Sequence, residues 1–230
     1  MKITVSYRDV SEVYFENQPL SKLPKIRRLM HLRRTWAHRK QFHTPGFYYF
    51  SSLKKHVYYE SYLESQILLH LDFTGDIQAL VEQPFLLSHA NQNHIPDFIC
   101  EHSSGEITLL NVKPAKFISK PDNIADFALA DAAAREAGWH HRVMTELNPY
   151  YIDNLQWLSA YRDEPYLLEV LTEQILNSLN QTKPLADVVR AVGDPYIVKP
   201  VVFHLLWHQR LFTKLEQQFS LQMPLWIGEP

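Results

Sequence analysis

Residues 60–116 read ESYLESQILLHLDFTGDIQALVEQPFLLSHANQNHIPDFICEHSSGEITLLNVKPAK and contain one helix-like segment followed by three short strand-like runs. The helix-like segment has apolar residues at three- and four-residue intervals, the period of a helix with one buried face: Leu63, Ile67, Leu68 and Leu71. The strand-like runs are rich in Val, Ile, Leu and Phe and are separated by turn-type residues: 81–87, 94–102 and 106–112. This order predicts a helix followed by an antiparallel meander.

Polar residues occur at the ends of these predicted elements. Glu64 lies beside the apolar stripe of the helix, from where a carboxylate can reach a site on the adjacent sheet. Asp97 follows Pro96, and Asn111 and Lys113 are two residues apart, which predicts that they share a face of their strand. Two carboxylates, an amide and an ammonium suit Mg²⁺, which prefers oxygen ligands and keeps several waters. For Glu60, a solvated position on the outer helix face is favoured over a catalytic role.

The order of an acid on a helix, Pro-Asp, and then x-x-Lys resembles the restriction-endonuclease-like nucleases. More narrowly, four short motifs resemble TnsA, the endonuclease subunit of Tns-type transposons, including CRISPR-associated ones: YESYLE (59–64), EQPF (82–85), IPDF (95–98) and NVKPA (111–115). The resemblance implies that Glu64, Asp97 and Lys113 are catalytic, and that Mg²⁺, or Mn²⁺ in its place, is held by Glu64, Asp97 and the backbone carbonyl of Val112. Asn111 departs from the usual acid of the superfamily, although TnsA-like proteins tolerate an amide there.

Length and composition limit the classes of protein that fit. The 230 residues suffice for one large domain or two small ones, and 46% hydrophobic residues exclude a mainly disordered chain. The single cysteine, Cys100, cannot form an internal disulfide, and no apolar run is long enough to span a membrane. A reducing, cytoplasmic compartment fits these features, and the TnsA resemblance implies a bacterial protein that is nucleoid-associated during transposition. His204 and His208 lie one helical turn apart, and a packed or solvent-exposed role is favoured for them over zinc.

A formal net charge of −2 means that any affinity for DNA must come from a local patch. Residues 22–40 contain eight Lys and Arg residues and no acid, which fits either a solvated face or a surface that contacts phosphates; we favour DNA because the segment precedes the predicted nuclease core. Residues 46–59 predict a hairpin around SSLKK, and the TnsA resemblance places its lysines near the DNA entrance. The predicted DNA-binding residues are Arg27, Arg28, Arg33, Arg34, Lys54 and Lys55.

Beyond this core, residues 122–138 predict a helix that Asp122 caps and Gly138 ends, and HHRVMT (140–145) predicts one further strand beside the meander. Three helical patterns then follow, at 166–179, 185–193 and 196–212, with a short hairpin from LFTKL (211–215) and MPLW (223–226), the composition of a winged helix. The predicted fold is thus α/β (α+β): a restriction-endonuclease-like core of mixed sheet and flanking helices in residues 1–164, and a winged helix in residues 165–230.

The resemblance implies a Mg²⁺-dependent DNA endonuclease subunit of a heteromeric cut-and-paste transposase, which hydrolyses the 5′ strands at transposon ends. Its expected partners are double-stranded DNA, a DDE transposase (TnsB-like) and an AAA+ ATPase regulator (TnsC-like), with the ATPase docking on the C-terminal domain. Two alternatives remain open. One is a free-standing restriction or repair nuclease with the same site, and the other is a DNA-binding scaffold whose catalytic site has decayed at Asn111.

Overall fold

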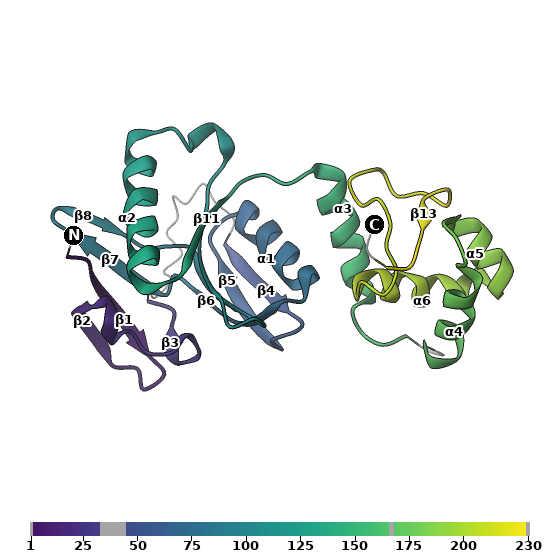
Figure 1. The fold of residues 1–230 in the computed structure, drawn as a ribbon, viewed down its shortest axis with the longest axis horizontal. Coiled ribbons are helices and arrows are strands. Elements are labelled where there is room, and N and C mark those ends of the chain that lie inside the picture. Colours follow the sequence, from purple (N-terminus) through teal and green to yellow (C-terminus); the bar gives the residue numbers. More distant parts are fainter. Residues whose placement is uncertain (1, 33–44, 166–167, 229–230) are drawn as a thin grey trace. The chain divides into compact units, whose positions relative to one another are not determined.

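The computed structural model describes residues 2–32, 45–165 and 168–228. The chain forms two compact units, Met1–Glu146 and Leu147–Pro230, in a mixed α/β fold. The predicted boundary after residue 164 is therefore misplaced by one helix. Figure 1 labels the elements along the chain.

The central sheet of the first unit has the strand order β11-β10-β9-β6. Its members are β6 (Ile77–Glu82), β9 (Phe98–His102), β10 (Ile107–Val112) and β11 (His140–Met144). Strands β6, β9 and β10 are antiparallel neighbours, while β11 runs parallel to β10. This confirms the pairing of the second and third predicted strands and the further strand added after a helix.

The first predicted strand, 81–87, is wrong because it is divided between two sheets. Strand β6 ends at Glu82, and Phe85 begins β7 (Phe85–His89), which pairs with β1 and β8 instead. Gln83 has a φ of 41°. Pro84 has no N–H for a ladder hydrogen bond, so the dipeptide interrupts the strand.

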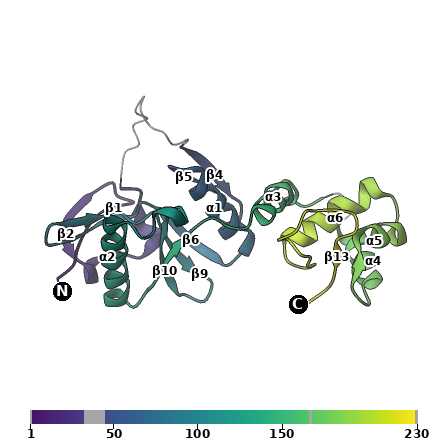
Figure 2. The same cartoon turned by 90° about the horizontal axis from the view of Figure 1, so that it is seen from above.

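Helices α1 (Tyr62–Thr74) and α2 (Pro121–Ala137) lie on opposite sides of β10 (Figures 1 and 2). The predicted stripe of α1 is buried at Ile67, Leu68 and Leu71. Ser61 is the N-cap of α1, whereas α2 begins at Pro121, one residue before the predicted cap Asp122. A proline suits this first position because the first N–H of a helix has no partner within the helix.

A second sheet carries the N-terminal residues. Its path is β2-β1-β7-β8, with β3 also paired to β1. Val5 and Leu87 pair across β1 and β7, and both belong to the hydrophobic core that includes Leu129 of α2. The other elements of the first unit include β1 (Thr4–Asp9), β2 (Tyr14–Pro19), β3 (Leu29–Met30), β8 (Gln92–His94), η1 (Leu20–Lys22), η2 (Ile26–Arg28) and η3 (Ala115–Phe117).

The predicted hairpin is present as β4 (Gly46–Phe50) and β5 (Lys55–Tyr59), an antiparallel pair. Its inner face packs on α1 through Phe50 and Val57, each with 0% exposure. Asp72 of α1 binds the turn that connects the two strands. Both of its carboxylate oxygens accept hydrogen bonds from the backbone N–H and the hydroxyl of Ser51, at 2.9–3.1 Å.

The second unit contains the three predicted helices preceded by α3, which the sequence had assigned to the first domain. Its elements are α3 (Pro149–Leu158), η4 (Ser159–Tyr161), α4 (Leu168–Ser178), β12 (Lys183–Pro184), α5 (Leu185–Val192), α6 (Pro195–Trp207) and β13 (Pro224–Leu225). Trp157 of α3 packs edge-on against Phe203 of α6, with 4.1 Å between ring centroids. Asn154 donates hydrogen bonds to the carbonyls of Leu215 and Gln217, both at 2.7 Å. These contacts explain why α3 belongs to the second unit.

The predicted C-terminal hairpin is shorter than expected. Phe212 and Trp226 form one antiparallel bridge, and β13 pairs with β12. In the described part of the chain, no helix combines the length and the apolar character needed to cross a membrane.

Candidate active site

One pocket of about 500 Å³ brings together Glu64, Asp97 and Lys113. Three segments form it: the start of α1 with the residues just before it, the residue before β9, and the end of β10 with the turn that follows. Its full lining is Glu60, Ser61, Tyr62, Leu63, Glu64, Asp97, Val112, Lys113, Pro114 and Phe117. The predicted convergence of these two acids and the lysine is therefore present, and Val112 lies beside them.

Asp97 is held between two strands by its own backbone. Its carbonyl accepts from the Gln83 N–H at 2.8 Å, and its N–H donates to the Leu110 carbonyl at 3.1 Å. The Val112 N–H donates to the side-chain Oδ2 of Asp97 at 2.6 Å, which restricts rotation of the carboxylate. Burial, followed by the negative charge of Glu64, raises the pKa of Asp97 to about 7. A buried carboxylate of this kind is costly to ionise unless a cation lies beside it.

Glu64 has a second role that sequence reasoning missed. Its Oε2 accepts from the Glu60 N–H at 2.8 Å, its Oε1 accepts from the Ser61 hydroxyl at 2.8 Å, and Ser61 Oγ accepts from the Glu64 N–H at 3.2 Å. This is a variant of the capping box, in which the Glu64 carboxylate binds the N–H of Glu60, the residue before the N-cap, and the sequence S-x-x-E at 61–64 could have revealed it. Burial raises the pKa of Glu64, although the hydrogen bonds from Glu60 and Ser61 oppose that shift. The same side chain thus starts α1 and places a negative charge near Asp97.

Lys113 enters the pocket just after β10 ends. Its backbone N–H donates to the Met144 carbonyl at 2.9 Å, which extends the pairing of β10 and β11 by one residue. The positive charge of Lys113 lowers the pKa of both Asp97 and Glu64, so the ammonium lies within electrostatic range of both carboxylates. A single cation therefore offsets part of the charge of two acids.

Asn111 does not line the pocket, and its predicted convergence with the other three residues is wrong. Its side chain is 1% exposed, Nδ2 donates to Nε2 of His94 at 2.8 Å, and Oδ1 accepts from Nε2 of His141 at 3.0 Å. Asn111 is a residue of β10, whereas Lys113 follows the end of that strand at Val112, and of the two only Lys113 lines the pocket.

The two histidines that hold Asn111 were not identified from the sequence, where residues 94, 111 and 141 show no informative spacing. His94 accepts from the amide at Nε2, so its proton resides on Nδ1, which faces the carboxylate of Asp126 at 3.5 Å. Burial lowers the pKa of His94 and of His141, which favours the neutral form of both rings. This network fixes β10 next to Val112, whose N–H binds Asp97.

The donor set in the pocket fits Mg²⁺ better than a softer ion. Glu64 and Asp97 provide two carboxylates, and Val112, which also lines the pocket, would offer its backbone carbonyl as a further oxygen. Magnesium is commonly bound by one or two carboxylates while waters and substrate phosphates complete its shell. Among residues 2–32, 45–165 and 168–228, no three His, Cys, Asp or Glu side chains come together as a metal-binding group, so the described side chains alone do not form a closed site.

Some of the predicted DNA-binding residues are bound to other groups of the protein, and others are exposed. Arg27 bonds to Gln78 at 3.2 Å and pairs with Glu101 at 3.7 Å, while Arg28 pairs with Asp9 at 3.4 Å. Lys54 is exposed in the hairpin turn.

Lys55 is not placed for phosphate contact. Its ammonium donates to the Leu80 carbonyl, and burial lowers its pKa. Arg33 and Arg34 lie outside the described residues.

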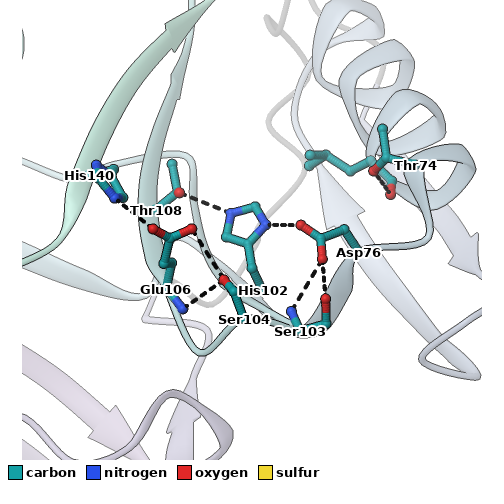
Figure 3. A network of polar contacts seen from close by, with 9 residues as sticks. Thr74, Asp76, His102, Ser103, Ser104, Glu106, Thr108 and His140 are labelled. Atoms are coloured by element: carbon teal, nitrogen blue, oxygen red, sulfur yellow. Dashed lines mark hydrogen bonds and ion pairs between the residues drawn. The ribbon is translucent and has the colours of Figure 1, made fainter. Parts of the chain in front are cut away.

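A separate polar network joins three strand ends (Figure 3). Asp76 accepts from Nδ1 of His102 at 2.8 Å, and the other ring nitrogen of His102 bonds to Thr108 Oγ1 at 2.9 Å. The order of acid, imidazole and hydroxyl is also found in hydrolase triads. Thr108 is only 4% exposed, however, so its hydroxyl is not accessible to a substrate. We interpret the network as a structural link between β6, β9 and β10.

His204 is buried and His208 is exposed, and both bind backbone carbonyls. His204 Nδ1 bonds to the Tyr161 carbonyl at 2.9 Å and His208 Nε2 to the Arg162 carbonyl at 2.9 Å. Both rings therefore attach the end of η4 to α6.

No protein-family model matches this chain, and no curated protein matches it.

Proposed function

We propose that this chain is a Mg²⁺-dependent DNA endonuclease, the subunit of a heteromeric cut-and-paste transposase that cleaves the 5′ strands at transposon ends. One observation carries the proposal. Two partly desolvated carboxylates, Glu64 and Asp97, meet Lys113 in one pocket, although the three residues belong to three separate segments of the chain. Strongly perturbed acids in a pocket are typical of catalytic sites.

The arrangement of elements supports the finer fold assignment. A helix that carries an acid, an antiparallel set that carries Pro-Asp and x-x-Lys, a second helix and a parallel strand occur in the order expected of a restriction-endonuclease-like core. In the second unit, α4, α5 and α6 with the β12–β13 pair support a winged helix.

Phosphodiester hydrolysis at this pocket requires an attacking water and stabilisation of charge on phosphorus. Bound Mg²⁺ would lower the pKa of a water and neutralise charge on the phosphate oxygens. The Val112 N–H holds Oδ2 of Asp97, which keeps that carboxylate in one orientation. Lys113 Nζ donates to the attacking water or to a non-bridging phosphate oxygen. The water oxygen forms a bond to phosphorus, the P–O bond to the departing sugar oxygen breaks, and the proton lost by the water reaches that oxygen through solvent, so that it leaves as a hydroxyl.

The position of Asn111 favours a second candidate, a DNA-binding scaffold without cleavage activity. Because the amide is held by His94 and His141, the pocket has only two carboxylates from Glu64 and Asp97. Two carboxylates are within the usual range for Mg²⁺, so we favour the enzyme.

The partners belong to the same proposal. A pocket of about 410 Å³ in the second unit is lined by several aromatic residues, including Trp157, Phe203 and Phe219, with Lys199 also at the pocket. Val202, Leu206 and Trp207 are buried, and the apolar surface of α6 is instead provided by Tyr196, 91% exposed, and Ile197. This supports docking of the AAA+ regulator on this unit, while a DDE transposase processes the other strand.

Cleavage by charge-removing variants tests the proposal. Asp97→Asn and Glu64→Gln should each reduce the rate of 5′-strand cleavage at least about 100-fold when Mg²⁺ and partner subunits are supplied. Glutamine at position 64 retains the capping box, so the loss of rate would report on charge and not on folding. Strand-specific cleavage of end-labelled transposon-end DNA provides the measurement.

Asp122→Asn is a matched control, because Asp122 is exposed in the first turn of α2 and outside the pocket. Wild-type cleavage rates for both Asp97→Asn and Glu64→Gln would show that the site is assigned wrongly. Absence of cleavage and of Mg²⁺ binding in the wild-type protein would favour the scaffold. Cleavage of plain duplex DNA without partners would instead favour a free-standing nuclease.

A further inference from the structure

One face of the β4–β5 hairpin is buried in the protein, and the other carries exposed aromatic side chains. Side chains alternate along a strand, so Tyr48 and Phe50 lie on one side of β4 and Phe47 and Tyr49 on the other. Phe50 is fully buried, whereas Phe47 is 67% exposed and Tyr49 is 44% exposed. The outward side therefore presents large rings at the surface.

Four aromatic rings share this outward side, which we call the aromatic face: Phe47, Tyr49, His56 and Tyr58. The strand register pairs Phe47 with Tyr58 and Tyr49 with His56. The ring centroids are 5.5 Å apart in the first pair and 5.3 Å in the second. Because each pair also contains a hydroxyl or an imidazole nitrogen, the aromatic face combines apolar ring surface with polar edges.

The aromatic face continues towards the candidate active site. Burial raises the pKa of Tyr58, and the charges of Glu60 and Glu64 raise it further, so Tyr58 lies within electrostatic range of the pocket acids. Tyr62, which is 61% exposed, lines that pocket itself. The chain passes from Tyr59 at the end of β5 to Ser61 at the start of α1 within two residues.

The hairpin is attached to the helix that carries Glu64. Asp72 of α1 accepts from the Tyr48 hydroxyl at 3.0 Å and, in addition to Ser51, from the Ser52 N–H at 3.3 Å. The aromatic face and the pocket are therefore fixed to the same helix.

Exposed aromatic rings beside a proposed phosphodiester site are suited to stack an unpaired nucleobase. Bases inside an intact duplex are stacked on their neighbours and offer no free face, whereas an unpaired base can stack on an aromatic side chain. We propose that the aromatic face stacks an unpaired nucleobase of the strand whose phosphate occupies the pocket. This proposal rests on the proposed nuclease function and adds a substrate class: DNA with a mismatched or frayed base beside the cleavage position.

The test is equilibrium binding of the full-length protein in EDTA, where no cleavage occurs. The probes are a fully paired duplex and the same duplex with one mismatched 2-aminopurine, whose fluorescence is quenched by stacking. Wild-type protein should bind the mismatched duplex about ten-fold more tightly and quench its fluorescence. Phe47→Ala with Tyr49→Ala should remove that preference. Phe47→Trp in the Tyr49→Ala background should restore part of it.

Tyr14→Ala is the matched control, because Tyr14 is an exposed tyrosine on β2 of the other sheet, and it should leave the preference unchanged. Equal affinity of the wild-type protein for both duplexes would overturn the proposal. So would a double variant that keeps the preference but no longer captures a partner subunit, since the face would then bind protein.

Asp97→Asn separates this proposal from the proposed function. A mismatch preference that survives in Asp97→Asn, while cleavage is lost, supports both proposals. Loss of cleavage in Asp97→Asn together with a wild-type preference in the Phe47/Tyr49 double variant overturns only the stacking proposal.

Discussion

At the scale of single residues, opposing effects act on the ionisation of the Asp97 carboxyl group. Burial and the charge of Glu64 disfavour its ionised form, while the Val112 N–H and the charge of Lys113 favour that form. The first two effects prevail and raise the pKa to about 7. When it is ionised, such a carboxylate lowers the stability of the metal-free protein, and a bound cation would offset that cost.

The stability of the metal-free protein should therefore depend on pH through Asp97. Its folded-state pKa of about 7 exceeds the reference value of 3.8, so the folded state holds the proton more tightly than the unfolded chain. The free energy of unfolding should fall as pH rises from about 4 to 7. Above that range it should stay low, because the buried carboxyl group is then ionised. Asp97→Asn should remove this fall and stabilise the protein at pH 8 by on the order of 3 kcal/mol. Urea denaturation in EDTA at several pH values measures it.

Added Mg²⁺ should stabilise the wild-type protein and leave Asp97→Asn unchanged, because the variant lacks a ligand carboxylate. The exposed Asp122→Asn should follow the wild-type pH curve. Parallel pH curves for wild type and Asp97→Asn would contradict the assignment of a buried, destabilising carboxylate.

At the scale of elements, Asp72 determines how the β4–β5 hairpin is attached to α1. The side chain is 3% exposed and accepts hydrogen bonds from Tyr48, Ser51 and Ser52. The sequence motif FSSLK therefore ends a strand and also provides donors to Asp72 of α1, which is 21 residues from Ser51. Attachment of this kind depends on a buried acceptor that the local sequence of the hairpin does not contain.

Removing that acceptor should detach the hairpin. Asp72→Ala leaves the backbone N–H groups of Ser51 and Ser52 without their carboxylate partner, which should lower the free energy of unfolding by roughly 3 kcal/mol. Hydrogen exchange should also become faster for residues 46–59. Denaturant melts and amide exchange measure the two effects.

Asp131→Ala is the control for Asp72→Ala, because Asp131 forms an exposed i,i+4 pair with Arg135. Surface pairs of this kind contribute at most about 0.5 kcal/mol. An Asp72→Ala variant as stable as Asp131→Ala would show that the carboxylate does not anchor the hairpin.

At the scale of the whole molecule, the division between the two units depends on α3. Ile152, Leu155 and Leu158 are each at most 2% exposed, so α3 contributes a complete buried face to the second unit. Residues 163–165, two acids and one proline, have a composition typical of a domain linker, but composition does not show which core a preceding helix joins.

Fragments 147–230 and 165–230 should differ accordingly. The longer fragment should unfold cooperatively, whereas the shorter one loses three buried aliphatic side chains, about 5 kcal/mol or more of apolar burial. That loss is comparable to the whole stability of a small domain, so the shorter fragment should not fold. Circular dichroism melts of the two fragments decide the matter, and equal cooperative melts would contradict the boundary at Glu146.

Local sequence patterns determined much of this protein. Apolar spacing predicted α1, Gly138 predicted the end of α2, and the Pro-Asp and x-x-Lys motifs predicted which side chains meet Glu64. These features follow from interactions within a few residues, namely backbone hydrogen bonding, capping and side-chain periodicity. The mixed α/β class follows from the order of such elements.

Only the tertiary structure decided the features that depend on partners distant in the chain. His94 and His141 turn Asn111 away from the pocket, and the Leu80 carbonyl binds Lys55. Strand β7 leaves the central sheet to pair with β1, whose residues are about eighty positions earlier. A buried polar group is satisfied by whichever partner the fold places beside it, and sequence spacing alone does not encode that placement.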